Sequence, residues 1–553
     1  MSSEQPRAPD QEAETAALAR RARRNAFVIA TLTVLALALL LAQSLAHGHL
    51  SGLDEYDDGA YFGATLQLLH GILPYRESAF VQPPMLTVWF LPAAAVSLLH
   101  GTATALEAAR IFVDVIAAAN VAMVGLLMRR RPTLAVVVSM GAMAAFPGAV
   151  RSAQTVLIEP LLVFLCLAAL ACVLGGAQLR PSRRRILVGG LLLGAAGATK
   201  VWAIFPFIAV ALVVLRLGPR ACLTWIAGAA AGFVACSLPF FIGAPSAFIH
   251  DVFVTQAIRS AGSGYTGWER LADLTGLPGL YSAVAGAPTS GVVLLVAVLA
   301  ALVAACLLAF ATGPRRGLDT LEWCALAATL ATGAGLFVAP DYYYHYGGFE
   351  APFIALLYGA VAVRLRARVS RATGAGTGSG ASAGAGAARA PGPRLAAVVA
   401  VSAIPLVLLG AMVKLRIETI AAAPPATQVA AVVGDHLPAE GCILYTDPAV
   451  GILADRFTAD ARGCPTVVDW LGEERVLDHG MDESASDTRS AALQSRWLAA
   501  VRASVAMVIN KNTNWDATVR RYAREHFHLV STHRAFAVYV RDRIARRSSG
   551  NLG

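Results

Sequence analysis

Long apolar runs recur along the chain, and short arginine clusters separate them. The first run covers about residues 26–46, and the next, at about 106–128, ends at Arg129, Arg130 and Arg131. Runs of about 20 apolar residues are long enough to cross a bilayer as helices. Only 14% of the 553 residues are charged, against roughly 25% in ordinary soluble domains. This pattern excludes a soluble globular protein, and it argues against nucleic-acid binding although the formal charge is +10.

The arginine clusters predict how the spans are oriented. Cytoplasmic loops of membrane proteins carry an excess of arginine and lysine. Residues 1–24 end in ArgArgAlaArgArg, and if they stay in the cytoplasm, alternating spans bring each later cluster to the same side. We therefore predict a polytopic α-helical membrane protein with about eleven spans, a cytoplasmic N-terminus and an extracytoplasmic C-terminal domain. The Ala/Arg-rich, Lys-poor composition is typical of a GC-rich bacterial genome, so we expect the membrane to be a bacterial plasma membrane.

The same pattern divides the chain into segments. They are a cytoplasmic tail at 1–24, a main transmembrane domain at 25–371 with its first extracytoplasmic loop at 47–103, a Gly/Ala-rich linker at 372–393, a last transmembrane helix at 394–413 and an exterior domain at 414–553. The low-complexity linker is predicted to be disordered and cytoplasmic.

The exterior domain is predicted to be a small α/β fold. Strand-like runs at 442–446, 466–469, 506–510 and 535–540 alternate with helical stretches such as Ala491–Ala503. Cys442 and Cys464 both lie in this domain, where an oxidising compartment favours a disulfide between them. Two unpaired buried thiols are the alternative.

Carboxylates concentrate directly after the first span. Residues 53–62 read LeuAspGluTyrAspAspGlyAlaTyrPhe, which places Asp54, Glu55, Asp57 and Asp58 within five positions. Charge runs of this kind are usually solvated surfaces. Crowded carboxylates also raise one another's pKa, which suits a general base that works near neutral pH. The cluster alone is compatible with both interpretations.

The surrounding residues resemble the first extracytoplasmic loop of the GT-C superfamily of integral-membrane glycosyltransferases. The likeness is carried by DDGAYFGATLQLLHGILPYRE at 57–77 and FVQPPM at 80–85. It is closest to the branch of protein O-mannosyltransferases and lipid A aminoarabinose transferases. In that branch an acidic pair precedes a tyrosine, a short helix, ProTyrArg and ProPro. The resemblance makes Tyr61, Tyr75 and Gln82 expected substrate-loop residues.

Two positions depart from the family pattern. Asp58 stands where glutamate is more common, which leaves Asp54 and Glu55 as an alternative acidic pair. Val81 stands where relatives often carry an acidic residue linked to metal. The resemblance therefore leaves a divalent metal as an open question, and it implies no other cofactor.

The resemblance implies an inverting transfer of a mannose- or arabinose-type sugar from a polyprenyl phosphate to an extracytoplasmic glycan, lipid or protein. Such a reaction needs a carboxylate that takes the proton of the acceptor hydroxyl and cations that hold the phosphate. Asp57 is the expected base, and Asp58 is expected to orient it or to hold an acceptor or ion. If the register is shifted, Asp54 and Glu55 take these roles.

Weaker motifs supply the other expected site residues. IleGluPro at 158–160 resembles a second acidic motif, with Glu159 as its carboxylate, although a helix-capping role for Glu159 fits almost as well. GlyAlaThrLys at 197–200 and TyrTyrTyrHisTyr at 342–346 resemble segments near the donor site. The expected ligands of the donor phosphate are Lys200, Arg76, Arg259 and His345.

The sequence is also compatible with two other classes of function. A transporter or lipid flippase is also polytopic with few functional charges, but transporters place ionisable groups near the midplane and often contain internal repeats. The acidic residues here lie at helix ends, and no repeat is evident. A catalytically degenerate GT-C-like scaffold is the third interpretation, because Asp58 and Val81 both depart from the pattern.

Overall fold

The computed structural model describes most of the chain. The described residues are 9–175, 178–259, 264–278, 288–311, 317–374, 410, 413–414, 416–417, 433–477, 490–513 and 515–542. The predicted linker at 372–393 lies outside them except for its first residues, which continue helix α18. Most of the predicted last span at 394–413 also lies outside them.

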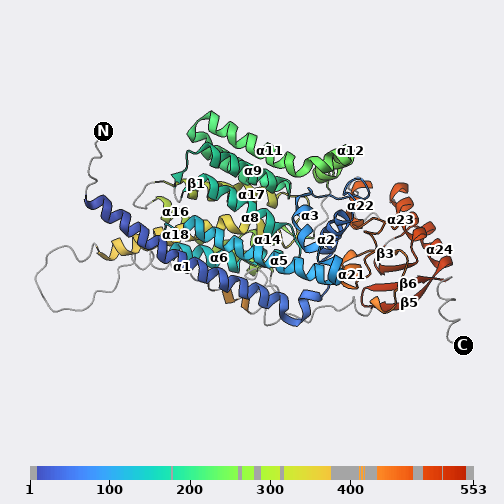
Figure 1. Ribbon diagram of the computed structural model, residues 1–553. Helices are drawn as coiled ribbons and strands as arrows, with labels where there is room; N and C mark the ends of the chain where they lie inside the picture. The colour runs from blue at the N-terminus through green and yellow to red at the C-terminus, as the bar shows by residue number, and fades with distance from the viewer. Residues whose placement is uncertain are drawn as a thin grey trace, which may run out of the picture.

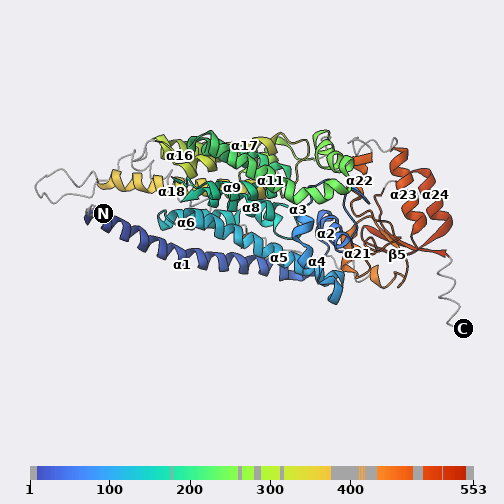
Figure 2. The same ribbon diagram turned by 45° about the horizontal axis from the view of Figure 1, so that its top comes forward.

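Long helices run side by side and form an elongated bundle (Figure 1). They are α1 (Pro9–Leu45), α5 (Ser97–Met128), α6 (Thr133–Ala145), α8 (Glu159–Val173), α9 (Arg183–Gly197), α10 (Ile204–Val214), α11 (Pro219–Gly243), α16 (Pro288–Ala311), α17 (Thr320–Phe337) and α18 (Gly347–Gly374). The N-terminus lies at one end of the bundle, and the C-terminal sheet lies at the other (Figure 2).

Six helices of the described chain are long and apolar enough to cross a membrane. This number is lower than the predicted count of about eleven, because several helices that match predicted spans are short. Helices α6 and α8 have 13 and 15 residues. At about 1.5 Å per residue, such helices do not reach across a hydrocarbon core of about 30 Å without flanking residues.

Close packing between α9 and α11 depends on glycine. A Cβ atom at Gly194 would lie 2.0 Å from the carbonyl oxygen of Ala229, and one at Gly232 would lie 2.1 Å from that of Leu191. Small residues let helix backbones approach closely in apolar surroundings, where dispersion contacts hold helices together. The outer faces of this bundle stay apolar. Leu223, for example, is 64% exposed, as expected for a lipid-facing surface.

Shorter elements connect the long helices. They are η1 (Ala46–Ser51), α2 (Tyr56–Leu69), α3 (Met85–Trp89), α4 (Leu91–Ala94), α7 (Pro147–Ser152), the two-stranded β1 (Leu174–Gly175) and β2 (Gln178–Leu179), η2 (Val201–Ala203), η3 (Leu215–Leu217), α12 (Pro245–Ile249), η4 (His250–Val254), α13 (Thr255–Ala257) and α14 (Gly267–Leu274). Helix α2 begins at Tyr56, so that Asp57 and Asp58 lie in its first turn.

The C-terminal part contains a four-stranded sheet in the order β3-β4-β6-β5. Its elements are β3 (Ile443–Tyr445), α21 (Pro448–Leu453), α22 (Trp470–Leu477), α23 (Ala491–Ala503), β4 (Ala506–Asn510), α24 (Ala517–His526), β5 (Phe527–His533) and β6 (Phe536–Arg541). Strand β3 is parallel to β4, and the other pairs are antiparallel. One face of the sheet packs on α23 and α24, and the other packs on α21. The strand predicted at 466–469 was wrong, because these residues form no strand.

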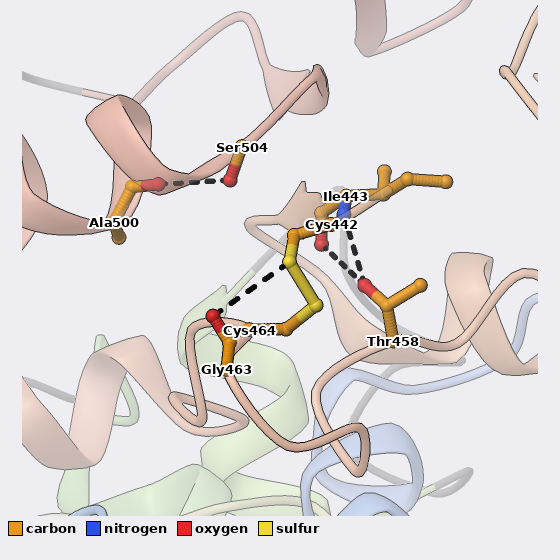
Figure 3. Close-up of a disulfide and its surroundings, with 7 residues drawn as sticks. All are labelled: Cys442, Ile443, Thr458, Gly463, Cys464, Ala500 and Ser504. Atoms are coloured by element: carbon orange, nitrogen blue, oxygen red, sulfur yellow. Dashed lines mark hydrogen bonds between the residues drawn. A yellow bond between two sulfur atoms is a disulfide. The ribbon is translucent and has the colours of Figure 1, made fainter. Parts of the chain in front are cut away.

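Cys442 and Cys464 form a disulfide with a Cα–Cα distance of 5.2 Å (Figure 3). It joins the start of β3 to the returning loop, and the Thr458 side chain bonds to the same strand. Thr458 Oγ1 accepts a hydrogen bond from the Ile443 amide at 2.9 Å and donates one to its carbonyl at 3.1 Å. The loop between the two cysteines is thereby fixed against the sheet.

The C-terminal part packs directly on α2 of the first loop. Helix α21 lies so close to α2 that a Cβ atom at Gly59 would be 2.3 Å from the backbone nitrogen of Ala449. At the other end of α2, Gln67 Nε2 donates hydrogen bonds to the carbonyls of Ala459, at 2.9 Å, and Thr466, at 2.6 Å. The first loop and the C-terminal part therefore form one interface.

We predict that Gly59→Ala separates α2 from α21 and destabilises the protein. The added methyl group meets backbone atoms, which cannot rotate away, and overpacking of this kind typically costs about 1–3 kcal/mol. Gly197→Ala is the matched control, because its Cβ would meet only an ordinary contact at 3.5 Å with the Phe233 ring. Thermal unfolding of both variants in detergent measures the difference. Equal melting temperatures for the two variants would contradict the predicted close approach.

Candidate functional site

The first turn of α2 separates the acidic residues of the first loop. Glu55 occupies the N-cap position, and Asp57 and Asp58 lie in the first turn. Neighbouring residues on a helix point about 100° apart. The two carboxylates therefore have different surroundings. Asp58 is fully buried in the bundle, whereas Asp57 stays partly exposed.

Asp58 is held by an ion pair with Arg110 of α5. Arg110 Nη2 lies 2.5 Å from Asp58 Oδ2, and the Thr155 hydroxyl donates a hydrogen bond to the same carboxylate oxygen. Arg110 Nη1 also donates to the carbonyls of Leu50, at 2.7 Å, and Gly52, at 2.8 Å. Instead of bonding to Asp57, the Asp58 carboxylate thus fixes α2 against α5. Sequence reasoning missed Arg110, although an arginine inside an apolar span is itself a signal.

Unlike Asp58, Asp57 forms its side-chain hydrogen bond within its own helix, α2. The Tyr61 hydroxyl, one turn later, donates a hydrogen bond to Asp57 Oδ2 at 3.0 Å. Tyr61 is buried and packs edge-on against Phe80, which fixes the position of its hydroxyl. Asp57 is thus a partly exposed carboxylate with one oriented hydrogen bond, an arrangement that suits a general base.

The alternative acidic pair, Asp54 and Glu55, contacts other groups. Asp54 Oδ1 lies 3.1 Å from His49 Nδ1, and the Tyr344 hydroxyl donates to Glu55 Oε2 at 2.6 Å. Burial raises the pKa of both carboxyls, and the charges of neighbouring carboxylates add to the shift. Burial is the larger cause of both shifts, in addition to the crowding of charges expected from the sequence.

Glu159, Lys200 and His345 come together from three distant segments. Lys200 Nζ lies 2.9 Å from Glu159 Oε1, and His345 Nδ1 lies 3.0 Å from Glu159 Oε2. All three side chains are buried. Glu159 begins α8, Lys200 follows α9, and His345 precedes α18. The three weaker motifs of the sequence therefore meet at one place.

Aromatic rings surround the Lys200 ammonium group. Its nitrogen lies 3.6 Å from the ring centroid of Trp202 and 4.3 Å from that of Tyr346. Cations are attracted to the faces of such rings, most strongly when water is excluded. Burial lowers the pKa of Lys200, and the negative charges of Glu159 and Asp57 oppose this shift. Asp57 therefore lies within electrostatic reach of the Lys200 cluster.

A second group of cations lies at Tyr343. Arg259 Nη2 donates to the Tyr343 hydroxyl at 3.2 Å, and Arg475 Nη2 donates to it at 3.1 Å. Both arginines also pair with Asp341. Arg475 belongs to α22 and thus comes from the C-terminal part. Its pKa is raised because nearby anionic oxygens, including those of Asp469 and Asp57, outweigh the effect of burial.

The residues near Asp57 therefore come from both ends of the chain. Asp469 precedes α22, is buried, and accepts hydrogen bonds from the Tyr56 hydroxyl at 3.1 Å and from the Gly472 amide at 2.8 Å. Sequence reasoning missed Arg475 and Asp469 because no motif marks them. Together the groups place a partly exposed carboxylate within electrostatic reach of Lys200 and Arg475.

Other predicted site residues point elsewhere. Arg76 is exposed and pairs with its neighbour Glu77 at 2.8 Å. Tyr75 has a left-handed backbone with a φ of 69°, packs against Phe80, and donates a hydrogen bond to the Gln82 carbonyl at 2.6 Å. These contacts shape the loop, and the structure does not bring Arg76, Tyr75 or Gln82 into the groups around Asp57. Among the described residues, no three His, Cys, Asp or Glu side chains gather as a metal site.

Comparisons with known proteins identify the fold. No protein-family model and no curated protein sequence matches the chain. The solved structure of ArnT from Cupriavidus metallidurans bound to undecaprenyl phosphate is similar, with a TM-score of 0.55 and 13% identity over 92% of this chain and 97% of that one. Its apo form gives a TM-score of 0.52 and 12% identity over 93% and 98%. The chain therefore shares its fold with ArnT, as the resemblance seen in the sequence implied.

We predict that Arg110→Met destabilises the protein by about 3–5 kcal/mol, because it leaves the Asp58 carboxylate buried without its cation. The double variant Arg110→Met/Asp58→Leu removes both charges and should recover much of this loss. Thermal or denaturant unfolding in detergent measures the series. If the double variant were less stable than Arg110→Met, the main effect of the pair would not be that the two side chains neutralise each other's buried charge.

Proposed function

We propose that the protein is a membrane glycosyltransferase that uses a polyprenyl-phosphate-linked sugar as donor. The GT-C-like fold, the apolar helices and the arrangement around Asp57 support this proposal. ArnT has been solved with undecaprenyl phosphate bound, and a donor of this class fits a site at the end of an apolar bundle. The transferred sugar is of the mannose or arabinose type, and the acceptor is an extracytoplasmic glycan, lipid or protein.

The observation that carries the proposal is that Asp57 lies within electrostatic reach of cations from two separate segments. One is Lys200, which follows α9, and the other is Arg475 of α22. The transfer reaction brings the negatively charged leaving group of the donor and the neutral hydroxyl of the acceptor to the same place. Cations stabilise the first, and a carboxylate base activates the second. An acidic surface that is only solvated would not require cations such as Lys200 and Arg475 near it.

In the proposed reaction, the acceptor oxygen attacks the anomeric carbon of the donor from the side opposite the phosphate. The bond between this carbon and the phosphate oxygen breaks as the new glycosidic bond forms, so the configuration inverts. Asp57 takes the proton of the acceptor hydroxyl, and the polyprenyl phosphate leaves with the electron pair. Lys200, Arg259 and Arg475 stabilise its charge, with His345 holding Glu159 against Lys200.

The segments proposed from the sequence fit this scheme. The tail at 1–24 is cytoplasmic, the main domain at 25–371 holds the lipid donor, and the part at 414–553 is extracytoplasmic and covers the first loop. The bacterial plasma membrane supplies the polyprenyl carrier. Arg475 gives the C-terminal part a direct role, because it brings a cation to the proposed phosphate site.

We predict that Asp57→Asn abolishes turnover, with at least a hundred-fold loss, because the amide cannot accept the acceptor proton. Release of polyprenyl phosphate from a panel of polyprenyl-phospho-sugars, with envelope extract as acceptor and with or without a chelator, measures this. Asp54→Asn is the matched control and should stay within a few-fold of wild type. Loss only in the Asp54 variant would move the base to the earlier pair. A lack of release by wild type would favour the transporter or scaffold interpretation.

We also predict that Arg475→Gln raises the KM for the donor about ten-fold or more, because it removes a charged contact to the phosphate. Arg76→Gln, on the exposed loop, is the matched control and should leave this KM unchanged. The two variants are compared by donor titration at saturating acceptor, with melting temperatures as a folding check. Equal KM values for the two variants would exclude Arg475 as a phosphate ligand.

A further inference from the structure

A cavity lined by arginines lies at the end of the bundle opposite the candidate site. Its volume is about 600 Å³, and it lies between the N-terminal part of α1, the start of α6 and the C-terminal part of α18. Figure 2 shows these helix ends on the side of the N-terminus, far from the C-terminal sheet. Its charged lining residues are Arg21, Arg24 and Arg366, and its apolar ones include Pro132, Leu134 and Val363.

These three arginines differ from their neighbours in having no carboxylate partner within the described part of the chain. On the same side, Arg131 and Arg364 pair with Asp319 and Glu322, so their charges are compensated. Arg21, Arg24 and Arg366 are exposed to the cavity mouth and solvent. The cavity thus combines three positive charges that have no carboxylate partner among the described side chains, and together they would attract an anion.

Side-chain hydrogen bonds hold the wall of the cavity in a defined position. Arg24 Nη2 donates to Thr133 Oγ1 at 2.7 Å, and Thr133 in turn donates to Asn25 Oδ1 at 2.8 Å. Asn25 is fully buried and donates to the carbonyls of Arg129 and Arg131, each at 2.8 Å. This network fixes the start of α6 against α1 and holds Arg24 at the rim.

We propose that this cavity binds the headgroup of an anionic phospholipid. The arginines would hold the phosphate, since guanidinium groups form bidentate hydrogen bonds with its oxygens. The apolar side chains beside them would contact the upper acyl chain, which a soluble phosphate lacks. Basic pockets between helices on the arginine-rich side of a membrane protein suit such headgroups. The bound lipid joins α1 to α18, which the cavity separates.

The test is native mass spectrometry of the full-length protein in detergent, titrated with phosphatidylglycerol or with phosphatidylcholine of the same acyl chains. Glycerol phosphate, which has the phosphate without acyl chains, is added as a competitor. We expect phosphatidylglycerol to bind wild type more tightly than phosphatidylcholine and to raise its melting temperature. Arg21→Gln/Arg24→Gln/Arg366→Gln should weaken phosphatidylglycerol binding at least about ten-fold. If the triple variant fails to fold, the single variant Arg366→Gln, at an exposed position, replaces it. This single variant should weaken phosphatidylglycerol binding several-fold.

The matched control is Arg183→Gln/Arg184→Gln/Arg220→Gln. It removes three exposed arginines at the starts of α9 and α11 and should stay within about two-fold of wild type. Equal losses of phosphatidylglycerol binding in both triple variants would show general attraction to the charged surface instead of a specific site. Unchanged binding in the cavity variants would also overturn the proposed lipid site. Effective competition by glycerol phosphate would reassign the cavity to a soluble phosphate.

Discussion

The buried ion pair between Arg110 and Asp58 is the contact on which the rest of the site depends. It costs desolvation of two charges, which the structure compensates with Thr155 and with the carbonyls that follow the first span. Because it fixes the start of α2 on α5, it sets the direction in which the next residue along the helix points. Asp57 thereby stays partly exposed and within electrostatic reach of Lys200 and Arg475.

From this anchor the structure extends to both ends of the chain. Helix α2 carries Gly59, where α21 packs without space for a side chain, so the C-terminal part is seated on the first loop. That seating brings Arg475 to Tyr343, where it meets Arg259. A carboxylate, a buried lysine and two arginines then share a region that excludes much of the water, which strengthens their electrostatic effects.

Short motifs predicted residues that the structure brings together. Glu159, Lys200 and His345 were singled out because each lies in a short pattern at a helix end, and Lys200 and His345 both contact Glu159 in the structure. Arg110 and Arg475 carry no pattern, and their partners are distant in sequence, so only the fold reveals them. Strand β4 and helix α23 match the predicted ranges. Residues 466–469 do not, because Thr466 bonds to Glu77 and Asp469 directly precedes helix α22 and accepts a hydrogen bond from its Gly472 amide.

The most direct test of the central claim is a cryo-electron microscopy structure of the protein in nanodiscs with an added polyprenyl phosphate. We predict that the phosphate density lies between Lys200 and the pair formed by Arg259 and Arg475, with Asp57 beside it and free of the phosphate. Phosphate density elsewhere, for example at exposed Arg76, or an apolar tail placed away from the end of the bundle that carries Asp57, would show that these residues do not bind the donor.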